Sequence, residues 1–475
     1  MISWWGADVS LGKPSRVRRA QLVANELEEL AQRISRFPAT LGQTVDDVEV
    51  WLCRTSRWAF GFEPTGLRPS LMLGRDQIGL RVLKDGKLGA ASCTRFDEST
   101  WRGCVDQALA AATTTAGPSQ FTAPRTRKPG PLTFDPDLCD AILAPGELHR
   151  MADAVVDNLR HEATRTPGLT AFGGHARYTL KRFVVGTRGG VCASIHGGVS
   201  AEVVLNRDHA DTFHTVHNPE SFQPLALLGV RTLRGRPTES ASPRDLGLRG
   251  RVPVVLHPRA FEALLRRLVA PLMAGSSKQN TLGFREGDRV AHSAFTLVED
   301  AGLDGLFSSR HFDDEGSPTR RNPLVMRGRL TQTLLPRGPN GQPGSAASYR
   351  HTLGTTEPQE VGPRPTASSL FVERGEVAFH ELVAGLDKSL LVQSFMGLHG
   401  ADPITTQFSS GVGTGVTLER GRESRLLAPG AWNVSGACLT LPGGVAGFLS
   451  DIVLSRELYD TGTAILPYCL TTLSV

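Results

Sequence analysis

Two short strings in this chain pair a histidine with a glutamate, as zinc peptidases do. A zinc peptidase needs two imidazoles and a third ligand around the ion, and a carboxylate that takes a proton from bound water. The 475 residues contain neither HExxH nor HExxxH. In His161-Glu162 and His380-Glu381 the second histidine is missing, because Arg165 and Ala384-Gly385 stand at the required spacing. Both pairs are therefore interpreted as polar helix or loop positions.

The densest set of metal-ligating residue types follows a predicted strand and leads into Asn218-Pro219. Its members are Asp208, His209, Asp211, His214 and His217. These residue types could bind a metal ion. Structural zinc sites have tighter paired spacing, so we expect these side chains to spread along an exposed loop.

Signals for a serine nucleophile and for a phosphate loop are absent. No GxSxG string occurs. Gly411 to Gly415 reads Gly-Val-Gly-Thr-Gly, which lacks the GxGxxG spacing, is followed by no Lys-Ser/Thr pair, and leads into a strand-like stretch, Val416 to Glu419. A glycine-rich turn or a close backbone approach explains it better.

The most distinctive string is Phe-Asp-Asp-Glu-Gly-Ser-Pro-Thr-Arg-Arg, residues 312–321. Asp313, Asp314 and Glu315 could coordinate a hard cation or act as acid and base. They could equally belong to a turn whose acids are neutralised by Arg320 and Arg321 or accept backbone N–H bonds. The residue types alone favour the turn.

Composition indicates a globular chain of two or three domains. Hydrophobic residues make up 40% and charged residues 21%, and the 51 glycines favour many strands and tight turns. The net charge of +5 comes from scattered arginines, which predicts no nucleic-acid surface.

Cysteine usage and hydropathy bear on the compartment. The seven cysteines are odd in number and include no CxxC pair, so we expect reduced thiols and a cytoplasmic protein. The first residues lack a basic segment followed by an apolar one, and no run of about 20 apolar residues occurs. We therefore expect neither an export signal nor a membrane span.

The first half of the chain alternates helices with strands. Hydrophobic periodicity, turn residues and composition predict the following segments: a helix 20–37, a strand 48–52, a hairpin 78–92 turning at Asp85-Gly86, a helix 99–112, a Pro/Thr-rich linker 113–131, a helix 145–162, and paired strands 178–185 and 199–205. These segments indicate two α+β units, residues 1–120 and 121–245.

The second half, residues 246–475, has the texture of a large antiparallel β-rich domain. One helix is predicted within it, residues 258–274, with Pro258 at its first position and an apolar stripe through Phe261 and Leu265. Residues 336–365 hold so much Pro, Gly and Ser that we expect a loop without an ordered core element. The predicted fold class is α+β, with the β-rich domain last.

Several pieces of the sequence, in order, resemble the TldD/PmbA family of peptidase subunits, once called modulators of DNA gyrase. The resemblance covers most of the chain and rests on Ile78 to Val82 with Asp85-Gly86 and Gly89, Ala108 to Ala111, Val254 to Leu256, Phe312 to Gly316, Gly328 to Leu330, Phe408-Ser409, and Gly436-Ala437-Cys438 with the run to Leu470. It implies a TldD/PmbA-like fold and a peptidase complex.

The family has a TldD type with HExxxH on the helix after a strand, and a TldE/PmbA type without it. Alignment on Leu264-Leu265 puts Arg266 and Arg267 in the His-Glu places and Pro271 at the second histidine. None of the three can bind zinc, since proline has no donor side chain and guanidinium stays protonated. Without a family role, Arg266 is expected to form an exposed ion pair with Glu262, of about 0.3 to 0.5 kcal/mol.

The sequence departs from the family pattern in two places. Thr405 to Ser409 reads Thr-Thr-Gln-Phe-Ser where TGDFS is usual, and Ser368-Ser369 replaces the usual asparagine after a proline. The departures suggest a divergent, specialised member, for example one that serves the maturation of a peptide natural product.

The resemblance implies a TldE/PmbA-type subunit of a metallopeptidase complex, with no catalytic or metal-binding residue of its own. Whether the chain alone is an enzyme stays open. Zinc is expected in a TldD-type partner, and the substrate is an unfolded or linear peptide. The residues expected to face the peptide or the partner are Arg266, Arg267, Asp313, Asp314 and Glu315. Two alternatives remain: an enzyme with relocated metal ligands (His209, His214, His217, Cys469), or a peptide-binding homodimer.

Overall fold

The computed structural model describes most of the chain. The residues that it describes are 17–40, 44–68, 71–113, 121, 153, 156–157, 160–161, 164–165, 169–207, 210–217, 240–242, 247–273, 283–303, 306, 308–336, 344–350, 363–428, 430–440 and 446–475. The predicted linker, most of the predicted helix 145–162, and parts of the predicted loop 336–365 lie outside these residues.

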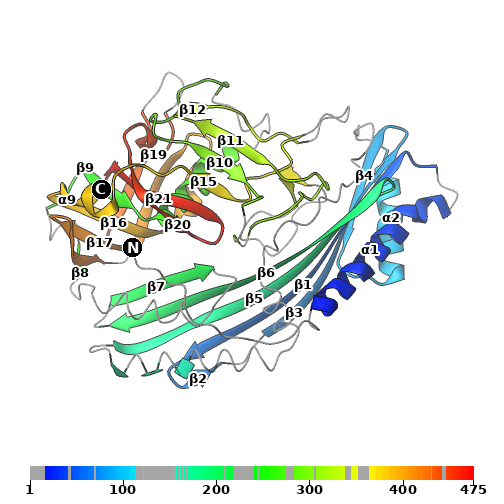
Figure 1. The fold of residues 1–475 in the computed structure, drawn as a ribbon, viewed down its shortest axis with the longest axis horizontal. Helices are drawn as coiled ribbons and strands as arrows, with labels where there is room; N and C mark the ends of the chain where they lie inside the picture. The colour runs from blue at the N-terminus through cyan, green and yellow to red at the C-terminus, as the bar shows by residue number, and fades with distance from the viewer. Residues whose placement is uncertain are drawn as a thin grey trace.

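The N-terminal part is built on a long twisted antiparallel sheet (Figure 1). Its strand order is β4-β3-β1-β5-β6-β7, and β2 pairs with the end of β1. The strands are β1 (Asp47–Glu63), β2 (Gly66–Leu67), β3 (Leu71–Lys84), β4 (Lys87–Cys93), β5 (Leu169–Thr187), β6 (Gly190–Arg207) and β7 (Ala210–His217).

Two helices cover one face of this sheet at the end where β3 and β4 meet (Figure 1). They are α1 (Val17–Thr40) and α2 (Glu98–Ala111), close to the predicted ranges. Asp97 begins α2 by accepting a hydrogen bond from the backbone N–H of Thr100. The apolar stripes of both helices pack on alternate residues of the strands, among them Val50 and Leu80, because alternate strand residues share a face.

The hairpin predicted at Asp85-Gly86 is confirmed. Both residues have positive φ, 52° and 68°, as a two-residue turn between antiparallel strands requires. Further along β4, Gly89 lies so close to α2 that an added Cβ would sit 1.8 Å from the carbonyl oxygen of Ala108. Glycine is required there by space, and the hairpin and α2 are thereby held in contact.

The C-terminal part is a second, mixed sheet with order β12-β11-β10-β15-β21-β9-β16-β17-β18-β8. Its strands are β8 (Ser240–Ala241), β9 (Arg251–Leu256), β10 (Leu297–Asp300), β11 (Arg321–Met326), β12 (Arg329–Leu330), β15 (Leu370–Val372), β16 (Lys388–Met396), β17 (Gln407–Glu419), β18 (Arg422–Leu427), β19 (Asn433–Ala437), β20 (Val453–Asp460) and β21 (Ala464–Ser474). A separate ladder joins β13 (Ser348–Tyr349) and β14 (Arg364–Pro365).

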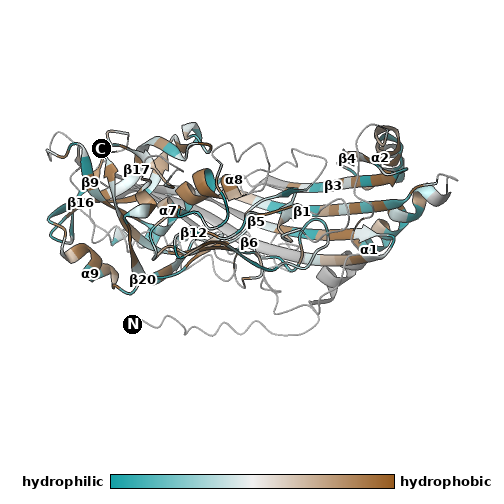
Figure 2. Cartoon of the chain, turned by 90° about the horizontal axis from the view of Figure 1, so that it is seen from above, coloured by the Kyte–Doolittle hydropathy of each residue, from teal (hydrophilic) through white to brown (hydrophobic). Residues whose placement is uncertain are grey.

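Strand β19 pairs with both β17 and β21, so the path from β21 through β9 and β16 to β17 closes on itself. The large apolar core fills the space around this closed set of strands and around the helix that follows β9. Figure 2 shows that helix, labelled α7 and α8, among the strands with hydrophobic residues along it. Burial of that apolar stripe holds the helix in place.

Three predictions about organisation need correction. The units 1–120 and 121–245 share one sheet, because β1 pairs with β5 along most of its length. Strand β8 belongs to the C-terminal sheet although it precedes residue 246. The C-terminal sheet is not wholly antiparallel, since β15 with β21, β16 with β9, and β18 with β8 are parallel. In the described part of the chain, no helix has the length and hydropathy to cross a membrane.

Candidate functional site

The predicted helix 258–274 is found as three consecutive pieces. They are α7 (Pro258–Leu264), a π-helical turn at Leu265–Val269, and α8 (Ala270–Met273). The π turn is marked by the hydrogen bond from the N–H of Ala270 to the carbonyl of Leu265. Pro271 provides the physical reason: it has no N–H, and in a regular helix its ring would clash with the carbonyl four residues earlier.

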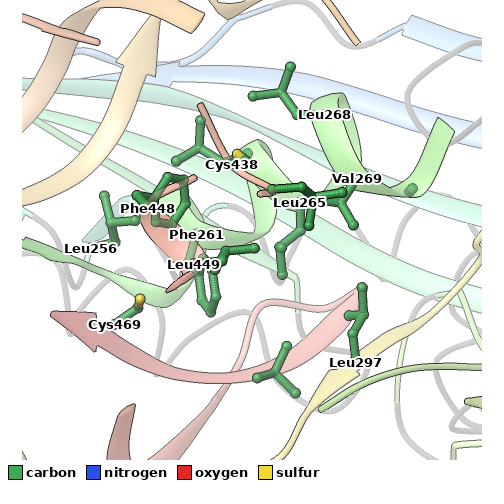
Figure 3. Packing of buried hydrophobic residues seen from close by; sticks show 14 of the residues in the cluster. Leu256, Phe261, Leu265, Leu268, Val269, Leu297, Cys438, Phe448, Leu449 and Cys469 are labelled. Carbon is green, nitrogen blue, oxygen red and sulfur yellow. The ribbon is translucent and has the colours of Figure 1, made fainter. Parts of the chain in front are cut away.

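The π turn bears on the spacing of a metal motif. Hydrogen bonds over five residues bring side chains five apart to the same side of the helix, which an α-helix does not do. Arg266 and Pro271 have this spacing. The π turn therefore brings residues 266 and 271 toward the same side of the helix, as the two histidines of an HExxxH motif would require. Figure 3 shows the neighbouring Leu265, Leu268 and Val269 packed in the apolar core.

The guanidinium group of Arg266 forms hydrogen bonds within its own chain. Nε donates to Oε1 of Glu262 at 2.6 Å, Nη1 donates to the carbonyl of Ala367 at 3.1 Å, and Nη2 donates to the carbonyls of Ser368 and Thr463 at 3.2 and 2.7 Å. The side chain thus joins the helix to two distant loops.

The ion pair expected between Arg266 and Glu262 exists, but it is not solvent-exposed as predicted. The two side chains are 20% and 11% exposed. Burial disfavours the charged form of Glu262, yet Arg266 and the hydroxyls of Thr461 and Thr463 hold its pKa below the usual range. Because the pair is mostly dry, the two charges attract each other more strongly than in a surface pair, and removing one would leave the other without its partner.

Arg267 anchors the loop that follows β16. Its Nη2 donates to the carbonyls of His399 and Ala401, at 2.6 and 3.0 Å. With Pro271 beside them, the two guanidinium groups leave the motif positions without a donor for zinc, so these residues do not fit the ion. Elsewhere in the described residues, no three His, Cys, Asp or Glu side chains form a group that could hold a metal.

Asp313 is a fully buried turn residue. Its Oδ1 accepts the backbone N–H groups of Glu315 and Ser317 at 3.0 and 2.9 Å, and its Oδ2 accepts that of Ser348 at 3.1 Å. Burial and the charge of Glu315 raise its pKa well above the ordinary value. The turn interpretation, with backbone N–H donors, is confirmed for this residue.

The two other acids bind arginines, but not the predicted Arg320 and Arg321. Asp314 accepts from Nη1 of Arg310 at 2.6 Å, and Glu315 accepts from Nη2 of Arg81 at 3.1 Å. Arg320 instead donates to the carbonyl of Gly344. The partner of Asp314 precedes it by four residues in the same loop, and that of Glu315 lies on β3, so neither is among the arginines that follow the string.

Glu315 brings the C-terminal part against the N-terminal sheet. Arg81 on β3 donates to Glu315 and also forms a two-point ion pair with Glu49 on β1, at 2.7 and 2.5 Å. Arg350, which follows β13, reaches the same Glu49 at 3.2 Å. All four side chains are buried or nearly so.

Apolar and aromatic contacts surround this ion network. Phe312 packs with Trp51 and Phe183 on the sheet face that is turned toward the C-terminal part. Arg310 lies 4.3 Å from the centre of the Phe183 ring, and Arg350 lies 5.5 Å from that of Trp51. The string 312–315 therefore acts as a joint between the two parts of the chain.

Residues 345–350 correct the expectation that 336–365 holds no ordered core element. Ala347, Tyr349 and Arg350 are buried, and the β13–β14 ladder lies in this segment. Arg350, Arg81, Glu49 and Gly79 were all missed by sequence reasoning. Gly79 carried the one usable signal, a glycine inside a strand, which marks a close approach of another group.

The other predicted chemical strings lie apart from the joint. Exposed His380 and Glu381 are polar positions of α9 (Phe379–Ala384), as predicted. Gly411 to Gly415 lies within β17, where a Cβ on Gly415 would come 2.5 Å from the carbonyl of Leu391, so the close approach is confirmed. Cys469 is buried in the apolar core beside Leu256 (Figure 3).

The predicted metal-ligating set at residues 208–217 falls just before β7 (Ala210–His217) and along its length. Asp208 and His209 lie outside the described residues, as do the side chains of Asp211, His214 and His217 on β7. Metal binding by this segment stays a hypothesis.

The chain is a two-part α+β protein. Its N-terminal part is an antiparallel sheet covered by helices, and its C-terminal part is a partly closed mixed sheet with a helix that contains a π turn. Buried ion pairs join the two parts. Models of two domains of one family match the chain: the PmbA/TldA metallopeptidase C-terminal domain over residues 249–470, and PmbA/TldA metallopeptidase domain 1 over residues 73–112. The chain belongs to the TldD/PmbA family.

Solved structures agree with this fold. A Thermotoga maritima protein described as a modulator of DNA gyrase superposes with a TM-score of 0.71 at 19% identity, over 94% of this chain and 99% of that one. TldE from Thermococcus kodakarensis gives 0.71 at 16%, over 94% and 100%. An uncharacterized protein of Methanocaldococcus jannaschii is 22% identical over 338 residues, 70% of this chain and 75% of its own length.

Proposed function

We propose that this chain is a TldE/PmbA-type, non-catalytic subunit that pairs with a TldD-type zinc peptidase chain in the cytoplasm. The observation that carries the proposal is the state of the helix after β9. At the family's motif positions, Arg266 and Arg267 are bonded to backbone carbonyls of their own chain, and Pro271 offers no donor.

The geometry of the π turn supports the same proposal. The fold of a peptidase subunit is retained around the turn, while the side chains there tie loops together. Catalysis is then supplied in trans, by zinc in the partner. An unfolded or linear peptide is the substrate that suits such a pair, because an extended chain can add to a strand edge through main-chain hydrogen bonds with little sequence preference.

The wider assignment to peptide natural-product maturation is part of the proposal. It is motivated by the departures at Thr405 to Ser409 and at Ser368-Ser369. In the structure, Thr406 has a positive φ of 57°, and Ser368 and Ser369 lie buried near Arg266 and Ser308. These positions belong to the loops that the π-turn helix holds.

The test uses the chain expressed alone and together with a TldD-type partner, with a casein-derived unfolded peptide mixture as substrate. We expect co-purification with the partner and cleavage by the pair only, lost on adding a chelator. Chelator-sensitive cleavage by this chain alone, with near-stoichiometric zinc, would refute the proposal and favour relocated metal ligands. A stable homodimer that binds peptide and ignores the partner would favour the stand-alone binding module.

A further inference from the structure

One lysine on the inner face of the N-terminal sheet forms no ion pair with the residues that the structure describes. Lys181 lies on β5, directly opposite Thr55 of β1, on the face that also carries Cys53 and Phe183. It is largely shielded from solvent, and within the described part of the chain it makes no hydrogen bond or ion pair. An ammonium group held out of water without a partner is costly, so a fold that keeps one there invites an anion.

The charges around Lys181 strengthen that argument. Its neighbours include Arg310 and Arg57, and the nearby carboxylate is that of Asp314. Asp314 is already committed, since Arg310 donates to Oδ1 and the backbone N–H of Arg350 donates to Oδ2. Burial is the main cause that lowers the pKa of Lys181; the charges of Arg310 and Arg57 also lower it, while those of Cys53 and Asp314 act in the opposite direction. Among the described side chains that act on Lys181, two are arginines and one is a carboxylate.

A second unsatisfied donor lies on the same face. Gln77 of β3 pairs in register with Cys53, and of the neighbouring charges Cys53 has the largest effect on the pKa of Lys181. Gln77 is 3% exposed, and its Nε2 has no hydrogen-bond acceptor. Buried amide donors are almost always paired. Gln77 and Lys181 therefore place two donors on the same face of the sheet, on the strands to either side of β1.

We propose that Lys181 and Gln77, with the charge of Arg57, form a carboxylate-binding subsite on the inner face of the N-terminal sheet. The ligand is a carboxylate of a linear peptide, from its C-terminus or from an acidic side chain. Carboxylate oxygens accept from an ammonium and an amide together, and they supply the missing negative charge. This proposal rests on the proposed function, since it assumes that the chain holds peptides.

The test measures peptide binding by fluorescence anisotropy, with the full chain alone and with its co-purified partner. The probes are three labelled octapeptides of alanine and glycine: the free acid, the C-terminal amide, and the amide with one internal glutamate. We expect the free acid or the glutamate peptide to bind about tenfold more tightly than the plain amide. Which of the two gains affinity identifies the source of the carboxylate.

Two variants assign the effect. Lys181→Met should abolish the preference for the acid while the plain amide binds as before. Lys87→Met, at an exposed lysine that begins β4 of the same sheet, should keep that preference. A plain amide that binds as tightly as both acids, or a preference that survives Lys181→Met, would overturn the subsite and leave peptide holding intact. Failure of all three probes to bind, with or without the partner, would reject both proposals.

Discussion

The guanidinium group of Arg350 occupies the space where Gly79 has no side chain. A Cβ on Gly79 would lie 2.5 Å from Nη1 and 2.8 Å from Cζ of Arg350. Arg350 is itself buried and bonded to Glu49, so it cannot swing into water without breaking that ion pair. The inner face of β3 is therefore shaped to receive an arginine from the C-terminal part.

Gly79→Ala should weaken the joint between the two parts. The added methyl group forces Arg350 out of its position, and we expect a loss of roughly 1 to 3 kcal/mol in the free energy of unfolding. Urea denaturation followed by circular dichroism measures it. Gly74→Ala on the same strand is the control, because an added Cβ there meets nothing within 4 Å. Equal stability of the two variants would show that the Arg350 contact does not constrain the sheet.

Glu49→Gln should lower the free energy of unfolding more than Gly79→Ala does. Glu49 holds both Arg81 and Arg350, and removing its charge takes an ion-pair partner from two buried guanidinium groups at once. Breaking a buried pair in this way costs about 3 to 5 kcal/mol. The same denaturation measurement applies, together with limited proteolysis between the two parts.

Glu63→Gln is the matched control for Glu49→Gln. Glu63 pairs with Arg68 on the same strand system, but both side chains are well exposed. Its replacement should leave stability nearly unchanged, because solvent screens a surface pair. If Glu63→Gln lowered the free energy of unfolding as much as Glu49→Gln, burial would not be the reason that the inner ion pair matters for stability.

How much the sequence could predict depends on the range of the contacts. The Asp85-Gly86 hairpin and helix α2 were predicted because their signals lie within a few residues. The helix after β9 was predicted from its apolar stripe, but its π turn was not, since periodicity does not report a one-residue shift in hydrogen bonding. The joint could not be predicted: Glu315 and Arg81 are 234 residues apart, and Arg350 and Glu49 are 301 apart.

The Glu262–Arg266 pair should couple more strongly than a surface pair of the same spacing. In a double-mutant cycle with Glu262→Gln and Arg266→Met, we expect a coupling energy above about 1 kcal/mol, because both groups are mostly buried and oriented by further hydrogen bonds. The exposed pair Glu98–Arg102 on α2 has the same i, i+4 spacing and should give about 0.3 to 0.5 kcal/mol. Equal coupling energies for the two pairs would indicate that Arg266 is solvated like Arg102, and would contradict its role in holding the two loops.

Glu299 should make stability depend on pH. It is fully buried on β10 and accepts from Nδ2 of Asn322 at 2.7 Å, and burial raises its pKa to about 8. Between the ordinary value near 4.5 and about 8, the folded state keeps a proton that the unfolded state has lost. Stability contributed by this group is therefore present at low pH and falls as pH rises, by about 1.4 kcal/mol per unit within that window.

Glu299→Gln tests this pH dependence, since glutamine resembles the protonated acid and does not titrate. Unfolding free energies are measured at pH 5, 6 and 7 for the variant and the natural chain. We expect the unfolding free energy of the variant to rise relative to that of the natural chain with each increase in pH. The contributions of the other titrating groups cancel in this difference. A constant difference across the three pH values would show that Glu299 is already ionised in the fold, with Asn322 and the nearby Arg266 as its counterweight.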